Sequence, residues 1–148
     1  MRILFDLMAT QPNEGKFHGG GEYAKVVFQH LSCNKKDAEI ICFYDEDRHL
    51  DKDIVKIIEN NQLRLLHIDG KSDIQKIVST IKVDKIYSAL PYQFYGLNFG
   101  NLEFIYTIHG LRAIEMPTDR YAIRYASNIE DIAKYIYTRI SLSTDIFP

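Results

Sequence analysis

Three consecutive glycines, Gly19–Gly21, stand where a long loop runs into a predicted helix. Because glycine has no side chain, a ligand can come close to the free backbone N–H groups and the positive dipole end at the start of that helix. A helix start of this kind favours a phosphate or another anion, and a diphosphate suits the space that three glycines leave. The sequence therefore predicts an anion site here, with a flexible loop whose glycines only relieve packing as the alternative.

A histidine, His109, follows the β-branched and aromatic run Phe104–Ile108 and comes directly before Gly110. The run is typical of a buried strand, so the imidazole would stand at its carboxyl end. Near neutral pH an imidazole in that place donates a hydrogen bond to a sugar hydroxyl or to a developing charge. We predict a functional role for His109, against the alternative of a histidine that only satisfies structural hydrogen bonds.

The acidic and sulfur-bearing residues do not indicate a metal site. The triplet Asp45–Asp47 has the D-x-D spacing that holds a divalent cation in some sugar-transfer enzymes, since hard cations prefer clustered oxygens. It lies among basic residues such as Arg48 and Lys52, which indicates a solvated loop of mixed charge. Cys33 and Cys42 have no C-x-x-C spacing and no histidine pair with ligand spacing, so we expect two reduced, buried thiols.

Strands and helices alternate along most of the chain, judged by the periodicity of the apolar residues. Strands are predicted at 3–8, 39–44, 64–68, 85–89 and 103–108, and helices at 23–31, 51–60, 72–81, 119–125 and 129–140. The inward face of the first helix is predicted to comprise Tyr23, Val27, His30 and Leu31. The alternation predicts an α/β fold of the Rossmann-like, doubly wound kind, with a mainly parallel sheet and helices on both faces.

The predicted topology says where a site should lie. In open parallel sheets ligands bind beyond the carboxyl ends of the strands, so we expect the site in the loops after the first, fourth and fifth strands. The glycines follow the first of these strands, and His109 follows the fifth. The loop after the fourth strand, Pro91–Gly96, is rich in aromatic residues.

Length and composition indicate one globular domain. The chain has 148 residues, of which 46% are hydrophobic and 26% charged, which argues against a disordered or membrane-spanning protein. Its formal net charge of −2 gives no strong positive field, so no nucleic-acid partner is expected. No targeting segment is visible, which makes the cytoplasm the default location. The last residues, Ser141–Pro148, lack a charged tail or a helix cap, as in a fragment of a longer protein.

Two stretches of the chain resemble a known family. The stretch Phe17–Ala24 (FHGGGEYA), after the first strand, and the stretch Tyr106–Pro117 (YTIHGLRAIEMP), after a late one, are similar to the amino-terminal half of GT-B glycosyltransferases of the family 4 (group 1) type. The resemblance implies that residues 1–148 are the first, acceptor-side Rossmann-like domain. The donor-binding domain, which carries an E-x7-E motif and the nucleotide pocket, would be absent from this chain. Many relatives have aspartate where Gly110 stands.

The resemblance also implies an activity. Such enzymes move a sugar from a nucleotide donor, such as a UDP- or GDP-sugar, to a glycan or lipid-linked acceptor, usually with retention of configuration and without a metal or cofactor. The glycines Gly19–Gly21 would approach the donor diphosphate and the acceptor, and His109 would lie beside the transferred sugar. The partner of this domain would be its own carboxyl-terminal domain, so the isolated chain is expected to be inactive. A role in polysaccharide biosynthesis at the inner face of the membrane would follow.

Further residues are predicted to contact the acceptor, because aromatic rings in a strand-end loop can stack on sugar faces. The acceptor candidates are His18, Tyr92, Gln93, Phe94 and Arg112. The last segments also interleave basic residues with tyrosines, a pattern compatible with peripheral contact to an anionic membrane.

Two other functions compete with this interpretation. The stretch Gly19–Ala24 fits the G-x-G-x-x-A pattern of NAD(P)-dependent oxidoreductases, with Asp45 after the second strand, although a long loop separates the first glycine from the first strand. The chain could equally be a noncatalytic α/β module that binds a partner through its tyrosine-rich final helix.

Overall fold

The computed structural model describes residues 1–11, 19–35, 37–94, 97 and 99–107 of the chain. In this part, five strands form one sheet in the order β3-β2-β1-β4-β5, and every neighbouring pair is parallel. The strands are β1 (Arg2–Asp6), β2 (Glu39–Asp45), β3 (Arg64–Ile68), β4 (Lys85–Ser88) and β5 (Glu103–Tyr106). The helices are α1 (Gly19–Cys33), α2 (Lys52–Asn60) and α3 (Lys71–Thr80), with short 3-10 helices η1 (Met8–Thr10) and η2 (Pro91–Phe94). The predicted α/β, doubly wound class is confirmed.

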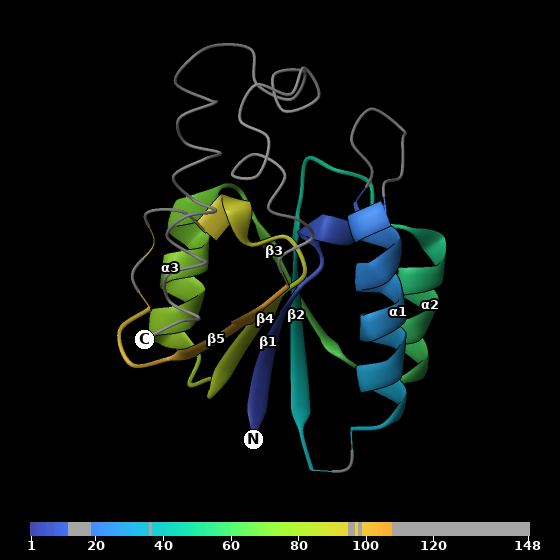
Figure 1. The fold of residues 1–148 in the computed structure, drawn as a ribbon, viewed down its shortest axis with the longest axis horizontal. Helices are drawn as coiled ribbons and strands as arrows, with labels where there is room; N and C mark the ends of the chain where they lie inside the picture. Colours follow the sequence, from blue (N-terminus) through green and yellow to red (C-terminus); the bar gives the residue numbers. More distant parts are fainter. Residues whose placement is uncertain (12–18, 36, 95–96, 98, 108–148) are drawn as a thin grey trace, which may run out of the picture. The chain divides into compact units, whose positions relative to one another are not determined.

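The helices cover both faces of the sheet, as Figure 1 shows: α1 and α2 lie on one face and α3 on the other. From β1 the chain steps through β2 to β3, then crosses back to β4 on the other side of β1. A right-handed crossover in the reversed direction puts its helix on the opposite face, which explains the position of α3. The strand order reverses between β1 and β4, so the loops that leave these two strands diverge at their carboxyl ends.

Each face of the sheet has its own core. On the α1 and α2 face, Phe5 packs against Phe28 with ring centroids 4.9 Å apart. On the α3 face, Leu4, Phe43 and Ile86 pack with Ile74 of α3. Since the central strands are buried on both sides, β1 and β2 read as nearly continuous apolar runs, which is why the sequence predicted them well.

The predicted inward face of α1 is wrong in part. Ala24 and Phe28 are fully buried against the sheet, whereas Tyr23 and His30 are exposed and Val27 is only half-buried. The helix has two apolar stripes, and a periodicity of 3.6 residues does not distinguish them. The stripe with the small Ala24 lets the helix approach the sheet closely enough for Phe28 to reach Phe5.

The remaining boundaries agree with the predicted ones to within a few residues, except that α1 begins at Gly19 instead of residue 23. The helices predicted at 119–125 and 129–140 lie outside the described residues. None of the helices that the structure describes has the length and apolar character needed to cross a bilayer.

An ion pair joins the two helices on the α1 face. Asp51 is the N-cap of α2, where its Oδ1 accepts a hydrogen bond of 2.8 Å from the Asp53 N–H. Its Oδ2 accepts a bond of 2.9 Å from Nζ of Lys25, and the two side chains are only 15% and 20% exposed. The hydrogen bond from Lys25 lowers the pKa of Asp51 below its ordinary value of 3.8. The cap and the ion pair therefore depend on one carboxylate.

We expect Asp51→Ala to lower the free energy of unfolding by about 1–2 kcal/mol, because it removes a helix cap and a partly buried ion pair together. Asp51→Ser keeps a capping oxygen and should recover part of that loss. The pKa of Asp51 is lower in the folded state than in the unfolded state. Its contribution to the free energy of unfolding is therefore fully present above the unfolded-state pKa and is lost as the pH falls through the folded-state pKa. Urea unfolding at pH 7 and at about pH 3 measures both effects.

The matched control is Asp53→Ala in the same turn of α2. Asp53 pairs with Lys56, but their side chains are 81% and 69% exposed, and exposed ion pairs contribute little. A loss for Asp53→Ala equal to that of Asp51→Ala would contradict the structural assignment of the cap.

Candidate functional site

A buried carboxylate marks the point where the strand order reverses. Asp6 is the last residue of β1 and Ser88 the last of β4, and both are fully buried. Ser88 Oγ donates to Asp6 Oδ2 at 2.6 Å, and the Met8 backbone N–H donates to Asp6 Oδ1 at 2.8 Å. These bonds join β4 to β1 and hold the start of η1 against their carboxyl ends. Sequence reasoning missed this pair; the available signal was one carboxylate at the end of an apolar strand.

A buried amide joins the loops that leave β1 and β2. Nε2 of Gln11 donates to the backbone oxygens of Asp45 and Arg48 at 2.9 and 2.8 Å. Oε1 of Gln11 accepts from the Asp45 N–H at 2.9 Å, and the Arg48 guanidinium donates to the Gln11 carbonyl oxygen. The 3-10 helix η1 is therefore fixed at one end by Asp6 and at the other by Gln11. Both ends of this turn lie where the carboxyl ends of the strands meet, which we call the carboxyl edge of the sheet.

The D-x-D triplet has local structural roles. Oδ1 of Asp45 accepts from the Asp47 N–H at 3.1 Å, within the turn that Gln11 holds. Among the described residues, no group of three or more His, Cys, Asp or Glu side chains is placed to hold a metal ion. Of the two thiols, Cys42 is buried and Cys33 is exposed, which corrects the expectation that both are buried. Burial raises the pKa of Cys42 to about 12, so it stays a neutral thiol.

The three glycines form the first turn of α1. Gly19 is exposed, Gly20 half-buried and Gly21 buried. A Cβ placed on Gly19 would meet no atom within 4 Å, so packing does not require a glycine there. The N–H groups in the first turn of any helix have no partner within that helix. The space where a Gly19 side chain would stand is open, whereas Gly21 is buried.

Hydroxyl groups of β4 and of the residue after β5 meet on the α1 face. Tyr87 of β4 stacks on Phe5 with centroids 4.9 Å apart, and its Oη lies 3.4 Å from Oγ1 of Thr107, which directly follows β5. Burial raises the pKa of the Tyr87 phenol, the hydrogen bond with Thr107 opposes this, and the Tyr23 phenol raises the pKa further. We call Tyr23, Tyr87 and Thr107 the hydroxyl row. No motif in the sequence included Tyr87, because its role depends on strands that are distant in the chain.

One acceptor candidate, Phe94, is buried in the core. Phe94 is 4% exposed, and its ring contacts Phe43, Phe99 and Phe104, so it is a core residue and is not available to stack on a sugar. The sequence interpretation of Phe94 is therefore wrong: its ring points inward and belongs to the core of the α3 face.

The other predicted residues are less informative. Tyr92 and Gln93 belong to η2, but the structure describes only their backbone. His18, His109 and Arg112 lie outside the described residues.

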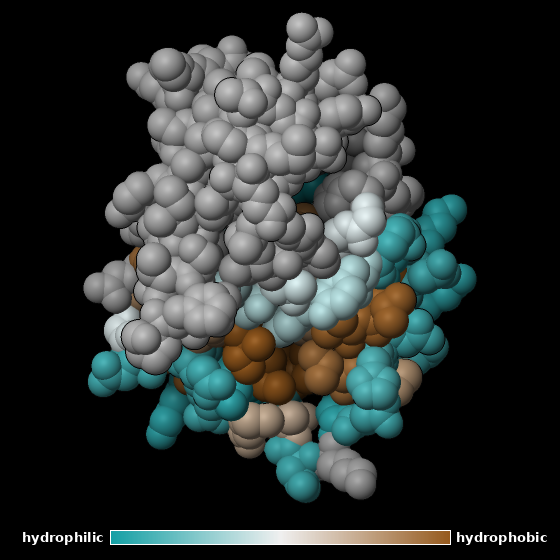
Figure 2. Space-filling model, viewed as in Figure 1, coloured by the Kyte–Doolittle hydropathy of each residue, from teal (hydrophilic) through white to brown (hydrophobic). Residues whose placement is uncertain are grey.

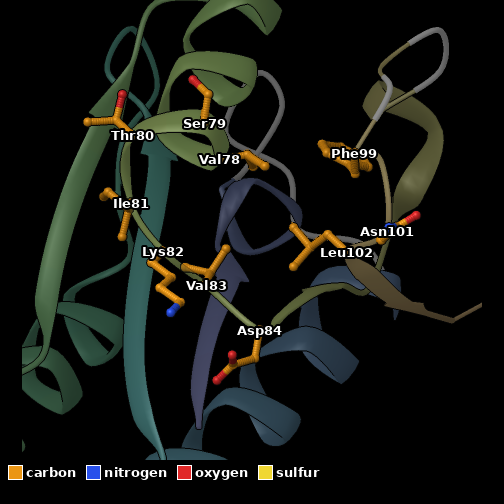
Figure 3. Close-up of a pocket in the computed structure, with 10 residues that line it drawn as sticks. All are labelled: Val78, Ser79, Thr80, Ile81, Lys82, Val83, Asp84, Phe99, Asn101 and Leu102. Atoms are coloured by element: carbon orange, nitrogen blue, oxygen red, sulfur yellow. The ribbon is translucent and has the colours of Figure 1, made fainter.

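A groove lies at the opposite edge of the sheet. It has a volume of about 560 Å³ and is lined by the end of α3, by the segment before β4 and by the segment before β5 (Figure 3). Asp84 and Leu102, which line it, directly precede β4 and β5, so the groove stands at the amino ends of the strands. Since ligands of parallel sheets bind at the carboxyl ends, this groove is not the candidate site.

Apolar residues are also exposed between hydrophilic ones in the view of Figure 2. On the α1 face, Val26 and Ile105 are among the most exposed large apolar side chains of the described residues. Val26 is one helical turn from Tyr23, and Ile105 is two residues before Thr107, so apolar side chains are exposed near the hydroxyl row.

The carboxyl edge thus combines two kinds of group. The start of α1 offers backbone hydrogen-bond donors, which match an anion, and the hydroxyl row offers donors and acceptors together, which match another hydroxyl. Comparisons with protein-family models, with curated proteins and with solved structures found no match for this chain.

Proposed function

We propose that this chain is the acceptor-side domain of a GT-B glycosyltransferase of the family 4 (group 1) type. The complete enzyme would move a sugar from a UDP- or GDP-sugar to a glycan or lipid-linked acceptor, with retention of configuration. The observation that supports the proposal is the start of α1 at the three glycines, after β1, where the strand order reverses, with no atom within 4 Å of a Cβ placed on Gly19. The resemblance of the stretches Phe17–Ala24 and Tyr106–Pro117 supports it.

The chemistry of sugar transfer suits this arrangement. A departing diphosphate needs charge stabilisation, which preorganised backbone N–H groups and a helix dipole supply at the start of α1. The oxocarbenium-like centre would lie beside His109, which follows β5 in the sequence. A second domain closing over this edge would exclude water and limit hydrolysis of the donor. His18, Tyr92, Gln93 and Arg112 remain proposed acceptor contacts, and no metal or cofactor enters the proposal.

A dinucleotide-binding oxidoreductase domain is the second candidate. The strand order 3-2-1-4-5 is also that of dinucleotide-binding domains, and Asp45 ends β2, where such domains place the acid that binds ribose. Against this, β1 ends at Asp6 and α1 begins at Gly19, so η1 and further residues intervene where the fingerprint needs a glycine directly after the strand.

Titration of the ¹⁵N-labelled chain separates the two candidates. We expect inorganic pyrophosphate, UDP-glucose and GDP-mannose to shift the amide resonances of Gly19–Gly21 at millimolar concentration. NADH should bind more weakly than these nucleotide sugars. Tight NADH binding at the glycines would support the oxidoreductase, and a lack of response there to all of the phosphate-bearing probes would remove the proposed site.

A substitution at Gly19 tests whether the open space serves a ligand. We expect Gly19→Ala to leave the fold intact, since its methyl group meets no atom within 4 Å and alanine favours a helix by up to about 1 kcal/mol. The same methyl group would stand between an anion and the helix start, so the affinity for pyrophosphate should fall about tenfold. Gln29→Ala, at an exposed position later in α1, is the matched control. Equal affinities for the two variants would show that the anion binds elsewhere.

A further inference from the structure

The strand β3 is an edge strand with a groove beside it. In the sheet that the described residues form, β3 pairs with β2 on one side and with no strand on the other. A groove with a volume of about 350 Å³ is lined by residues of β3, by residues of α3 and by Ile81, which directly follows α3. We call it the β3 groove. An exposed edge strand is where an extended peptide can join a sheet, and a pocket beside the strand takes some of its side chains.

Backbone groups of β3 point away from β2. The N–H of Glu46, which directly follows β2, donates to the Ile68 carbonyl oxygen at 3.1 Å, so the backbone of Ile68 faces β2. The N–H and C=O groups of one strand residue point to the same side, and successive residues alternate. Leu65 and His67 therefore present their N–H and C=O groups to the open side of β3, and no described residue hydrogen-bonds to them there.

The floor of the β3 groove is apolar. Leu66 of β3, Ile77 of α3 and Ile81 line it, and all three are half-buried and packed against the core of the α3 face. Leu65 is exposed, although native proteins usually protect an edge strand with charged residues or with a covering element. The groove therefore suits an apolar side chain of a partner strand.

The rim of the β3 groove is basic. The described residues that line it include Arg64, Lys76 and His67 and no acidic side chain. Arg64 takes part in none of the ion pairs that the described residues form. Lys76 and His67 approach acids only in exposed pairs, with Asp73 at 2.7 Å and Glu46 at 3.9 Å. Since the whole chain has a formal net charge of −2, this basic rim is a local feature that complements an acidic partner.

We propose that β3 and α3 bind an extended acidic peptide, which joins the sheet as a further strand beside β3. Its backbone pairs with Leu65 and His67, and an apolar side chain at its centre enters the β3 groove. Acidic side chains on either side of that one pair with Arg64 and Lys76. A small amphipathic anion matches the floor and the rim equally well, but it leaves the outward backbone groups of β3 unpaired. The proposal goes beyond the proposed function and does not depend on it.

Titration of the ¹⁵N-labelled 148-residue chain with the capped peptide Glu-Val-Ile-Val-Glu tests this inference. The first, third and fifth side chains of an extended peptide share one face, so the isoleucine lies between two glutamates. We expect the peptide to shift the amide resonances of Leu65 and His67. A peptide with lysine in place of both glutamates should bind at least about fivefold more weakly, because its charge is reversed.

A third peptide tests the backbone pairing by itself. It carries N-methyl groups on the isoleucine and on the valine before it, which keep both side chains. One of any two neighbouring N–H groups in an extended peptide faces β3, so this peptide always lacks a donor to the strand. It should also bind at least about fivefold more weakly than the unmodified peptide.

Lys76→Gln and Lys56→Gln are a matched pair of variants. Each lysine pairs with the aspartate three positions before it, at 2.7 Å in α3 and at 3.1 Å in α2, but only Lys76 lines the β3 groove. We expect Lys76→Gln to weaken the glutamate peptide at least about threefold and Lys56→Gln to leave its affinity unchanged. Leu65→Pro removes an outward N–H, which an edge strand tolerates, and should abolish the shift at His67. If this variant does not fold, the N-methylated peptide tests the same contact.

Several outcomes overturn the peptide site. The first is that the glutamate peptide causes no shift at Leu65 and His67, and the second is that the lysine or the N-methylated peptide binds equally well. Octanoate that shifts these resonances as strongly as the peptide would show a site for an amphipathic anion. Shifts that follow the concentration of the chain and not that of the peptide would show a second copy at β3. All of these outcomes leave the proposed function standing, because its probes are measured at Gly19–Gly21.

Discussion

Replacing Phe94 by alanine should lower the free energy of unfolding of this chain by about 3–5 kcal/mol, the range found for buried aromatic residues. The ring is 4% exposed and lies 5.1 Å from Phe104, 5.9 Å from Phe99 and 6.2 Å from Phe43, measured between centroids. Alanine would leave a cavity between β2, β5 and η2. Two of the three surrounding rings, Phe43 and Phe104, are held by strands, which limits collapse of this cavity. Urea unfolding followed by circular dichroism measures the loss.

A graded series makes this prediction specific. Phe94→Leu keeps most of the volume and should cost less than about 1.5 kcal/mol. Ile105→Ala is the matched control: its side chain is 40% exposed on β5, so its truncation should cost much less than that of Phe94. A small effect of Phe94→Ala would mean that the ring lies at the surface, and the acceptor role predicted from the sequence would return.

Loss of the Asp6 carboxylate should be the most damaging polar change. We expect Asp6→Ala to lower the free energy of unfolding by about 3 kcal/mol or more, because it removes the acceptor of buried hydrogen-bond donors. The Ser88 hydroxyl and the Met8 N–H both donate to this carboxylate. Without it, the start of η1 loses its attachment to the carboxyl ends of β1 and β4. We therefore also expect a weaker response of Gly19–Gly21 to pyrophosphate under conditions in which the variant is still folded.

A double-mutant cycle isolates the pair. Ser88→Ala alone leaves a buried carboxylate oxygen without that donor and should cost about 1–3 kcal/mol. Once Asp6 is removed, the Ser88 hydroxyl no longer has this carboxylate as its acceptor. The double variant should therefore be more stable than the sum of the two single losses predicts. Ser79→Ala, at an exposed helical position, should leave stability unchanged within error. Strict additivity of Asp6→Ala and Ser88→Ala would show that the two residues are not coupled.

Whether a predicted site residue could be placed from the sequence depends on whether local or long-range contacts determine its position. The sequence placed the first helix from residue 23, whereas α1 begins at Gly19; that the three glycines lie at the amino end of this helix was predictable. The burial of Phe94 was not, because an aromatic residue in a loop after a strand can face solvent or core. Only the positions of Phe43 on β2 and of Phe104 on β5 decide which.

By itself, the sequence determined the alternation of strands and helices, and with it the parallel sheet, because apolar periodicity depends on spacing within one element. The tertiary structure alone decided which distant residues meet. Asp6 and Ser88 are 82 positions apart and Gln11 and Asp45 are 34 apart, yet each pair is joined by hydrogen bonds. Such contacts depend on strand order and register, which place β4 and β2 on either side of β1, and no local pattern encodes that order.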